Sequence, residues 1–108
     1  MKEQAALSAL AAMSNKTRLR MVRALVVAGG DGLTAGEVAQ AVGASPSRAS
    51  FHLSVLVDAG LIASERTARQ VTFRVRFDAI GGLALYLIED CCGNNPTVRN
   101  CCFPNDTC

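Results

Sequence analysis

The stretch that decides the fold is TAGEVAQAVGASPSRASFHLSVLVDAG, which runs from residue 34 to residue 60. Thr34 followed three residues later by Glu37 is a capping box, so it predicts a short helix, and Gly43 ends that helix. Ser45 is then a second N-cap, and Pro46 occupies the first helical position, where the missing N–H of proline does no harm. Two short helices joined by a turn that contains glycine predict a helix-turn-helix.

Two further helices are expected before this stretch. Residues 3–13 are rich in alanine and leucine and contain no helix breaker. Ser14 or Asn15 then offers an N-cap for a helix that runs to about Ala28, where a glycine cluster follows. We expect this second helix to turn an apolar stripe inward. The members of the stripe are Leu19, Val22, Leu25 and Val26.

Two strands and a final helix are expected after the helix-turn-helix. Residues 61–66 and 71–77 flank a basic turn at 67–70, and residues 71–77 alternate strictly between apolar and polar side chains. Such a hairpin beside a helix-turn-helix is a wing. A last helix runs from Asp78 to about Cys92. The fold class is therefore mostly α with a two-stranded β-wing, a winged helix-turn-helix in the order helix, helix, helix, helix, strand, strand, helix.

The two terminal helices are more apolar than a chain of 108 residues can cover alone. We therefore expect a homodimer through the first and last helices. Residues 1–92 would form the DNA-binding and dimerisation domain, and residues 93–108 a cysteine-rich C-terminal tail. No apolar run approaches the roughly 18 residues that span a bilayer. The N-terminus lacks a hydrophobic stretch with a cleavage site, so the expected location is cytoplasmic.

The net charge of +2 is distributed unevenly along the chain. Residues 14–76 hold nine Lys and Arg against four Asp and Glu, whereas the remainder holds two against five. A basic middle between acidic ends suits a surface that meets phosphate, although an ordinary solvated surface gives the same pattern.

The helix that begins at Pro46 is the candidate recognition helix. Its first polar side chains suit base edges and phosphates, arginine is the usual partner of guanine, and an outward Phe51 suits a thymine methyl group. Arginines near the wing tip are placed for phosphate or the minor groove. The candidate DNA-binding residues are Ser47, Arg48, Ser50, Phe51, His52, Arg66, Arg69 and Gln70. For His52, a packed structural role is the favoured alternative. No nucleophile has a base beside it, so an enzyme is not expected.

These features resemble the ArsR/SmtB family of metal-responsive repressors. The resemblance rests on residues 10–19 (LAAMSNKTRL), the Ser-x-His-Leu pattern of residues 50–53, residues 56–62 (LVDAGLI) and the basic hairpin of residues 66–70. It implies a homodimer that blocks a promoter until an inducer ion binds. Two familiar sites of the family are absent. Residues 37–41 carry no Cys-x-Cys pair, and the last helix has no histidine for a zinc site.

All five cysteines lie in the last 18 residues: Cys91, Cys92, Cys101, Cys102 and Cys108. In a reducing compartment, clustered thiols more often bind metal or act in redox chemistry than form structural disulfides. The Cys91-Cys92 pair with Cys101-Cys102 downstream resembles arsenic repressors that carry a C-terminal Cys-Cys…Cys site. Neighbours on an ideal helix point about 100° apart, so the first pair can chelate one ion only if the helix frays. Gly93 and Pro96 favour such fraying.

The leading hypothesis is a repressor released from its operator by trivalent arsenic. The inducer would be arsenite, with antimonite or methylated arsenite as variants, bound by Cys91, Cys92 and either Cys102 or Cys101. Thiols at the negative end of a helix dipole are expected to stay protonated until the inducer binds. The open alternatives are a structural zinc site, sensing of zinc, cadmium or oxidants through the same cysteines, a non-regulatory thiolate metal-binding protein, and a tail that is inert beyond residue 93.

Overall fold

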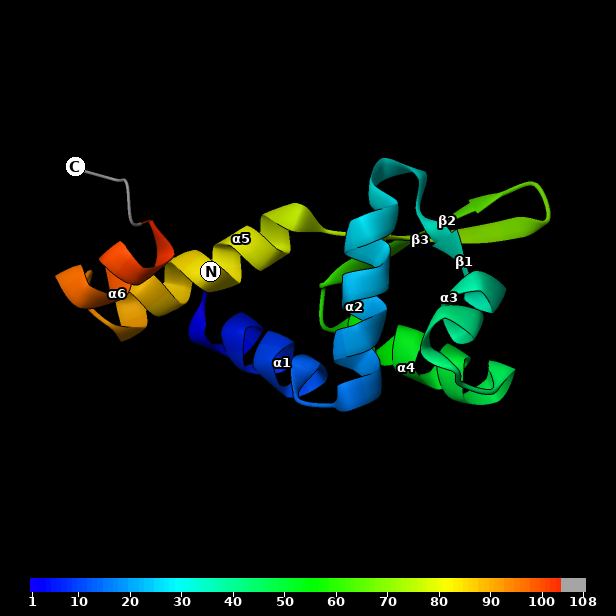
Figure 1. Ribbon diagram of the computed structural model, residues 1–108, viewed down its shortest axis with the longest axis horizontal. Helices are drawn as coiled ribbons and strands as arrows, with labels where there is room; N and C mark the ends of the chain where they lie inside the picture. Colours follow the sequence, from blue (N-terminus) through cyan, green and yellow to red (C-terminus); the bar gives the residue numbers. More distant parts are fainter. Residues whose placement is uncertain (104–108) are drawn as a thin grey trace.

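The computed structural model describes residues 1–103 and confirms the winged helix-turn-helix (Figure 1). The first four helices are α1 (Glu3–Met13), α2 (Lys16–Ala28), α3 (Ala35–Val42) and α4 (Pro46–Asp58). The strands are β1 (Leu33–Thr34), β2 (Ile62–Thr67) and β3 (Gln70–Val75). The remaining elements are a 3-10 turn η1 (Gly29–Asp31), α5 (Phe77–Leu85), a π-helical segment η2 (Tyr86–Cys91) and α6 (Pro96–Cys102). None of the helices in residues 1–103 is long and apolar enough to cross a membrane.

The helix-turn-helix forms through the caps that the sequence predicts. Thr34 Oγ1 accepts from the Glu37 N–H at 3.2 Å, and Glu37 Oε1 accepts from the Thr34 N–H at 2.9 Å. Hydrogen bonds to Thr34 also hold the pKa of the Glu37 carboxyl below its usual value. Gly43 ends α3 in the left-handed conformation at φ +68°, and Ser45 Oγ accepts from the Arg48 N–H at 3.3 Å. Each end of the reading unit is therefore fixed by local sequence.

The sheet has three antiparallel strands in the order β1-β3-β2. The sequence did not predict β1, because two residues are too few to show a period. The close approach of β1 to β3 requires a glycine at position 32. Gly32 has φ +67°, and a Cβ atom there would lie 2.5 Å from the Phe73 carbonyl oxygen. The expectation that the last strand reaches Phe77 is wrong. The pair of Ile62, the first residue of β2, with Val75 is the last in the ladder. The Arg76 N–H still donates to the Leu61 carbonyl oxygen at 2.9 Å, and Phe77 then begins α5.

The apolar face of α2 differs from the expected stripe. Met21, Val22 and Leu25 are buried, whereas Leu19 and Val26 are 43% and 44% exposed. At 100° per residue, Met21 and Val26 lie about equally far from the centre of the Val22 and Leu25 face, on opposite sides of it. The core covers the Met21 side and leaves the Val26 side exposed. The prediction for Leu19 and Val26 was therefore wrong, and α2 keeps an exposed apolar flank. The buried side chains of α2 pack with those of α3 and α4, among them Val38, Leu53 and Leu56.

Candidate DNA-binding surface and cysteine cluster

The N-terminal half of α4 presents polar side chains to solvent. Ser47, Arg48, Ser50 and Phe51 are all exposed, and Phe51 is 63% exposed. Ala49 and Leu53 on the opposite side of the helix are buried in the core. An arginine, two hydroxyl groups and an aromatic ring therefore stand on one helix that the core holds rigidly.

His52 lies inside rather than on this surface. It is 8% exposed, and Arg18 Nη1 donates to its Nδ1 at 3.1 Å, while Arg18 Nε donates to the carbonyl oxygen of Ala12. Burial, followed by the positive charges of Arg18 and Arg48, lowers the pKa of His52. The ring is thus neutral at pH 7 and accepts through Nδ1. In this position it links α4 to the junction of α1 and α2, as expected of a packed structural histidine.

The wing projects from the helical body (Figure 1). Thr67 pairs with Gln70, which leaves Ala68 and Arg69 as a two-residue loop, and Ala68 takes the left-handed φ of +55°. Arg66, Arg69 and Gln70 are exposed. Among residues 1–103, neither Arg66 nor Arg69 has a carboxylate oxygen within 4.0 Å. Both charges are therefore available to phosphate.

The Cys91-Cys92 pair lies where the last long helix changes form. The helix does not fray directly from α-helix to coil. It widens into η2, whose end is closed by the Cys92 N–H donating to the Leu87 carbonyl oxygen at 3.0 Å. Gly93 and Asn94 then reverse the chain with φ of +58° and +59°. Partial desolvation and then the neighbouring Cys91 raise the pKa of the Cys92 thiol, in the direction that the sequence predicts.

Cys101 and Cys102 lie on α6, a helix that the sequence analysis missed. The signal was present, because Asn95 before Pro96 repeats the cap of α4, and Asn95 Oδ1 accepts from the Thr97 N–H at 2.9 Å. Arg99 Nη1 donates to Asn94 Oδ1 at 2.9 Å and so ties α6 to the preceding turn.

All four of these thiols are exposed. Within residues 1–103, no three potential ligands are gathered as a ready metal site. Cys108 lies outside the described residues.

Comparison with known proteins agrees with this architecture. A family model described as a helix-turn-helix domain matches residues 13–65. The HTH-type transcriptional regulator YgaV of Escherichia coli K12 is 36% identical over 81 residues, which cover 75% of this chain and 79% of that protein. A solved structure of a possible transcriptional regulator for arsenical resistance is 30% identical, with a TM-score of 0.62 and coverage of 70% and 76%. An ArsR-like regulator from Rhodococcus sp. RHA1 is 20% identical with a TM-score of 0.74, covers 97% and 96% of the two chains, and supports the fold.

The chain belongs to the ArsR family. As an ArsR-family protein it is a DNA-binding transcriptional regulator and not an enzyme. In a helix-turn-helix the second helix of the motif is the one that enters the major groove, which makes the exposed residues of α4 candidates for DNA contact.

Proposed function

We propose that this ArsR-family regulator is a homodimeric repressor that trivalent arsenic releases from operator DNA. The observation that carries the proposal is that residues 91–102 hold four exposed thiols. This segment lies at one end of a molecule 47 Å long, and the wing lies at the other end (Figure 1). Residues 1–92 then form the reading and dimerisation domain, and residues 93–108 the tail that completes the inducer site.

In this proposal α4 enters the major groove. Arg48 contacts a guanine edge, Ser47 and Ser50 contact base edges or phosphate, and Phe51 packs on a thymine methyl group. Arg66, Arg69 and Gln70 of the wing contact the DNA backbone or the minor groove. His52 supports α4 from within.

Apolar side chains that α1 and α5 leave uncovered support the dimer. Leu7 and Leu10 of α1 are 52% and 41% exposed, and Phe77 and Leu85 of α5 are 55% and 50% exposed. A second copy that covered them would remove this apolar area from water. The winged helix-turn-helix domain Mb0332 of Mycobacterium bovis, which is 23% identical, is described as homodimeric. We extend that state to this chain.

The sulfur chemistry favours a soft, trivalent inducer. Thiolates select soft ions, and trivalent arsenic takes three of them in a pyramid. In this proposal the adjacent Cys91 and Cys92 supply two sulfurs. No three potential ligands are gathered within residues 1–103, so α6 would have to shift for Cys102 or Cys101 to supply the third. The raised pKa of Cys92 keeps its thiol protonated near neutral pH. Arsenite is As(OH)3 at this pH, so it would condense with three thiols, forming three As–S bonds and releasing three water molecules.

The test is fluorescence anisotropy of a labelled duplex taken from upstream of the protein's own gene. Arsenite, antimonite and methylarsenite are each expected to release the duplex from the wild-type protein. Cys91→Ser is expected to keep the complex intact at the same arsenite concentration. Cys101→Ser and Cys102→Ser form a matched pair, and only the one that removes the third ligand weakens the response to arsenite.

Two outcomes contradict this proposal. Full release of the Cys91→Ser protein by arsenite removes that residue from the site. Release by zinc, cadmium or peroxide, with no response to any arsenical, replaces the arsenic sensor with a sensor of metals or oxidants.

A further inference from the structure

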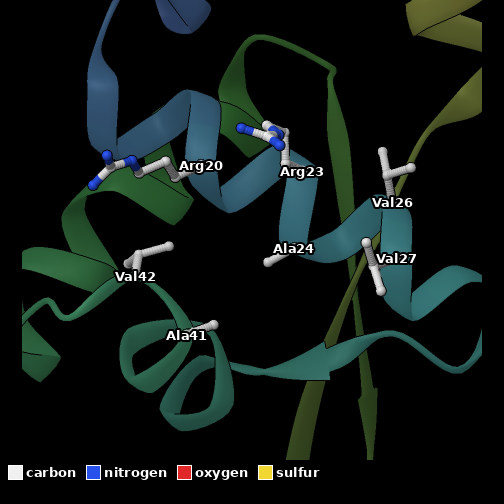
Figure 2. Close-up of a pocket in the computed structure, with 7 residues that line it drawn as sticks. All are labelled: Arg20, Arg23, Ala24, Val26, Val27, Ala41 and Val42. Atoms are coloured by element: carbon white, nitrogen blue, oxygen red, sulfur yellow. The ribbon is translucent and has the colours of Figure 1, made fainter.

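An open groove of about 510 Å³ lies between α2 and α3 (Figure 2). Its volume falls in the range of about 300–1,000 Å³ that small-molecule sites occupy. The residues that line it are Arg20, Arg23, Ala24, Val26, Val27, Ala41 and Val42. None of them belongs to the proposed DNA contacts, the apolar faces of α1 and α5, or the cysteine cluster. The groove is therefore separate from everything assigned above.

The groove carries positive charge that the protein does not neutralise. Arg20 and Arg23 are three residues apart on α2, so they share one face of the helix. Both are exposed, and within residues 1–103 neither has a carboxylate oxygen within 4.0 Å. By contrast, Arg74 and Arg76 pair with carboxylates at 3.2 Å and 3.0 Å. Two guanidinium groups are thus offered to an anion from outside the chain.

The rest of the groove is apolar. Val27 is 88% exposed, more than any other large apolar side chain in residues 1–103, and Val26 is 44% exposed. In Figure 2 the two valines lie at the end of α2 away from Arg20, with Ala24 between them and Ala41 and Val42 across the groove on α3. An apolar surface of this kind beside a charged one favours an occupant that has both characters.

We propose that this groove binds a small carboxylate with an apolar body. The carboxylate accepts hydrogen bonds from Arg20 and Arg23, and the body covers Val26 and Val27. A DNA phosphate satisfies the arginines but leaves the valines in water. Because the occupant bridges α2 and α3, and a short turn joins α3 to α4, occupancy acts on the reading unit without the cysteines. The inference therefore extends beyond arsenic sensing and does not depend on it.

The test is a ¹H–¹⁵N NMR titration of the full chain with octanoate and with benzoate. At least one of them is expected to give saturable shifts at the amides of Val27 and Ala41, and their relative affinity distinguishes an aliphatic from an aromatic body. Acetate keeps the charge without the body, and octanol keeps the body without the charge. Both are expected to bind at least about tenfold more weakly.

Variants locate the site. The double variant Arg20→Gln/Arg23→Gln is expected to lose about tenfold or more in carboxylate affinity. Lys16→Gln, on the same helix but outside the groove, is the matched control and is expected to bind normally. Val27→Asp places a negative charge in the apolar part at a solvent-exposed position, so the fold is retained while binding is lost.

Three results would overturn the inference. The first is equal binding of acetate or octanol, and the second is shifts confined to the apolar faces of α1 and α5. The third is weaker DNA binding by the double variant when no carboxylate is present, which assigns the two arginines to the DNA contact.

Discussion

The two ends of this molecule are built differently. At the reading end, α2, α3 and α4 enclose side chains such as Met21, Leu25 and Leu56 that are fully buried, and every helix start has a side-chain cap. At the cysteine end, none of the residues 89–103 is buried, and polar hydrogen bonds at Asn94 and Asn95 hold α6. The reading end is therefore rigid by itself, whereas the cysteine end has little packing to fix its geometry. A ligand or a second subunit can supply what is missing there.

Core truncation is the strongest test of this difference. Leu56→Ala removes a fully buried side chain of α4, so it is expected to lower the free energy of unfolding by about 2–5 kcal/mol. Cys102→Ala, on the exposed face of α6, is expected to change it by less than about 0.5 kcal/mol. Urea denaturation followed by circular dichroism measures both. Similar losses for the two variants would show that the cysteine end is packed after all.

DNA binding gives the next largest contrast. Arg48→Ala is expected to weaken binding to the operator by about 1–3 kcal/mol, because it removes a base-edge contact of α4. Arg99→Ala on α6 is expected to leave affinity unchanged, since its guanidinium bonds Asn94 and lies over Phe103. Anisotropy titrations at one fixed salt concentration compare the two. If Arg99→Ala weakened binding as much as Arg48→Ala, the proposal that only the reading end meets DNA would fail.

The helix caps give a smaller difference. Thr34→Ala removes the capping box of α3 and is expected to cost about 1 kcal/mol of stability. Asn95→Ala removes the equivalent cap of α6 but is expected to leave the main unfolding transition in place, because α6 unfolds locally before the core does. Hydrogen exchange of the α6 amides, measured beside the urea midpoint, separates local from global loss. An equal shift in the urea midpoint for Thr34→Ala and Asn95→Ala would refute this separation.

The smallest expected effect is a pH dependence of the free energy of unfolding that comes from His52 at the reading end. The folded state lowers the pKa of His52, so its contribution is complete above the ordinary imidazole value of 6.5 and is lost as the pH falls through the folded value. The free energy of unfolding should therefore decline below about pH 6.5, before the carboxyls titrate. His52→Gln should remove this part of the decline. Urea midpoints measured along a pH series test it, and an unchanged profile in the variant would rule His52 out.

The sequence was sufficient wherever a local signal determined the structure. The winged helix-turn-helix and its order of elements were predicted from the caps at Thr34 and Ser45, from Gly43, and from the alternating apolar and polar residues that form β3. Asn95-Pro96 carried an equally local signal for α6 that was passed over, because Gly93 and Pro96 were interpreted as signs that the preceding helix frays. The thiols themselves were found from the sequence, but their spatial relation depends on how η2 and α6 close.

What the sequence did not give depends on partners that are distant along the chain. β1 exists only because β3 lies beside it, and β3 stops before Phe77 because the Ile62–Val75 pair is the last pair between β2 and β3. The orientation of α2 depends on its packing against α3 and α4, and this packing leaves Val26 exposed rather than in the core. The π-helical η2 has no simple residue signature. The α2–α3 groove follows from the orientation of α2, and for that reason it was not visible as a motif.

The π-helical segment also affects how this chain can be compared with its relatives. Hydrogen bonds that span one more residue widen each turn, so every side chain after Leu85 is rotated less than an α-helix would rotate it. Counting residues from the apolar face of α5 to Cys91 on an α-helical wheel therefore points the sulfur in the wrong direction. A relative with the same spacing but an unbroken α-helix would present its thiols on another side. Equivalent cysteines should be matched by the direction in which they point, and a one-residue deletion within η2 would move the pair around the helix without removing either thiol.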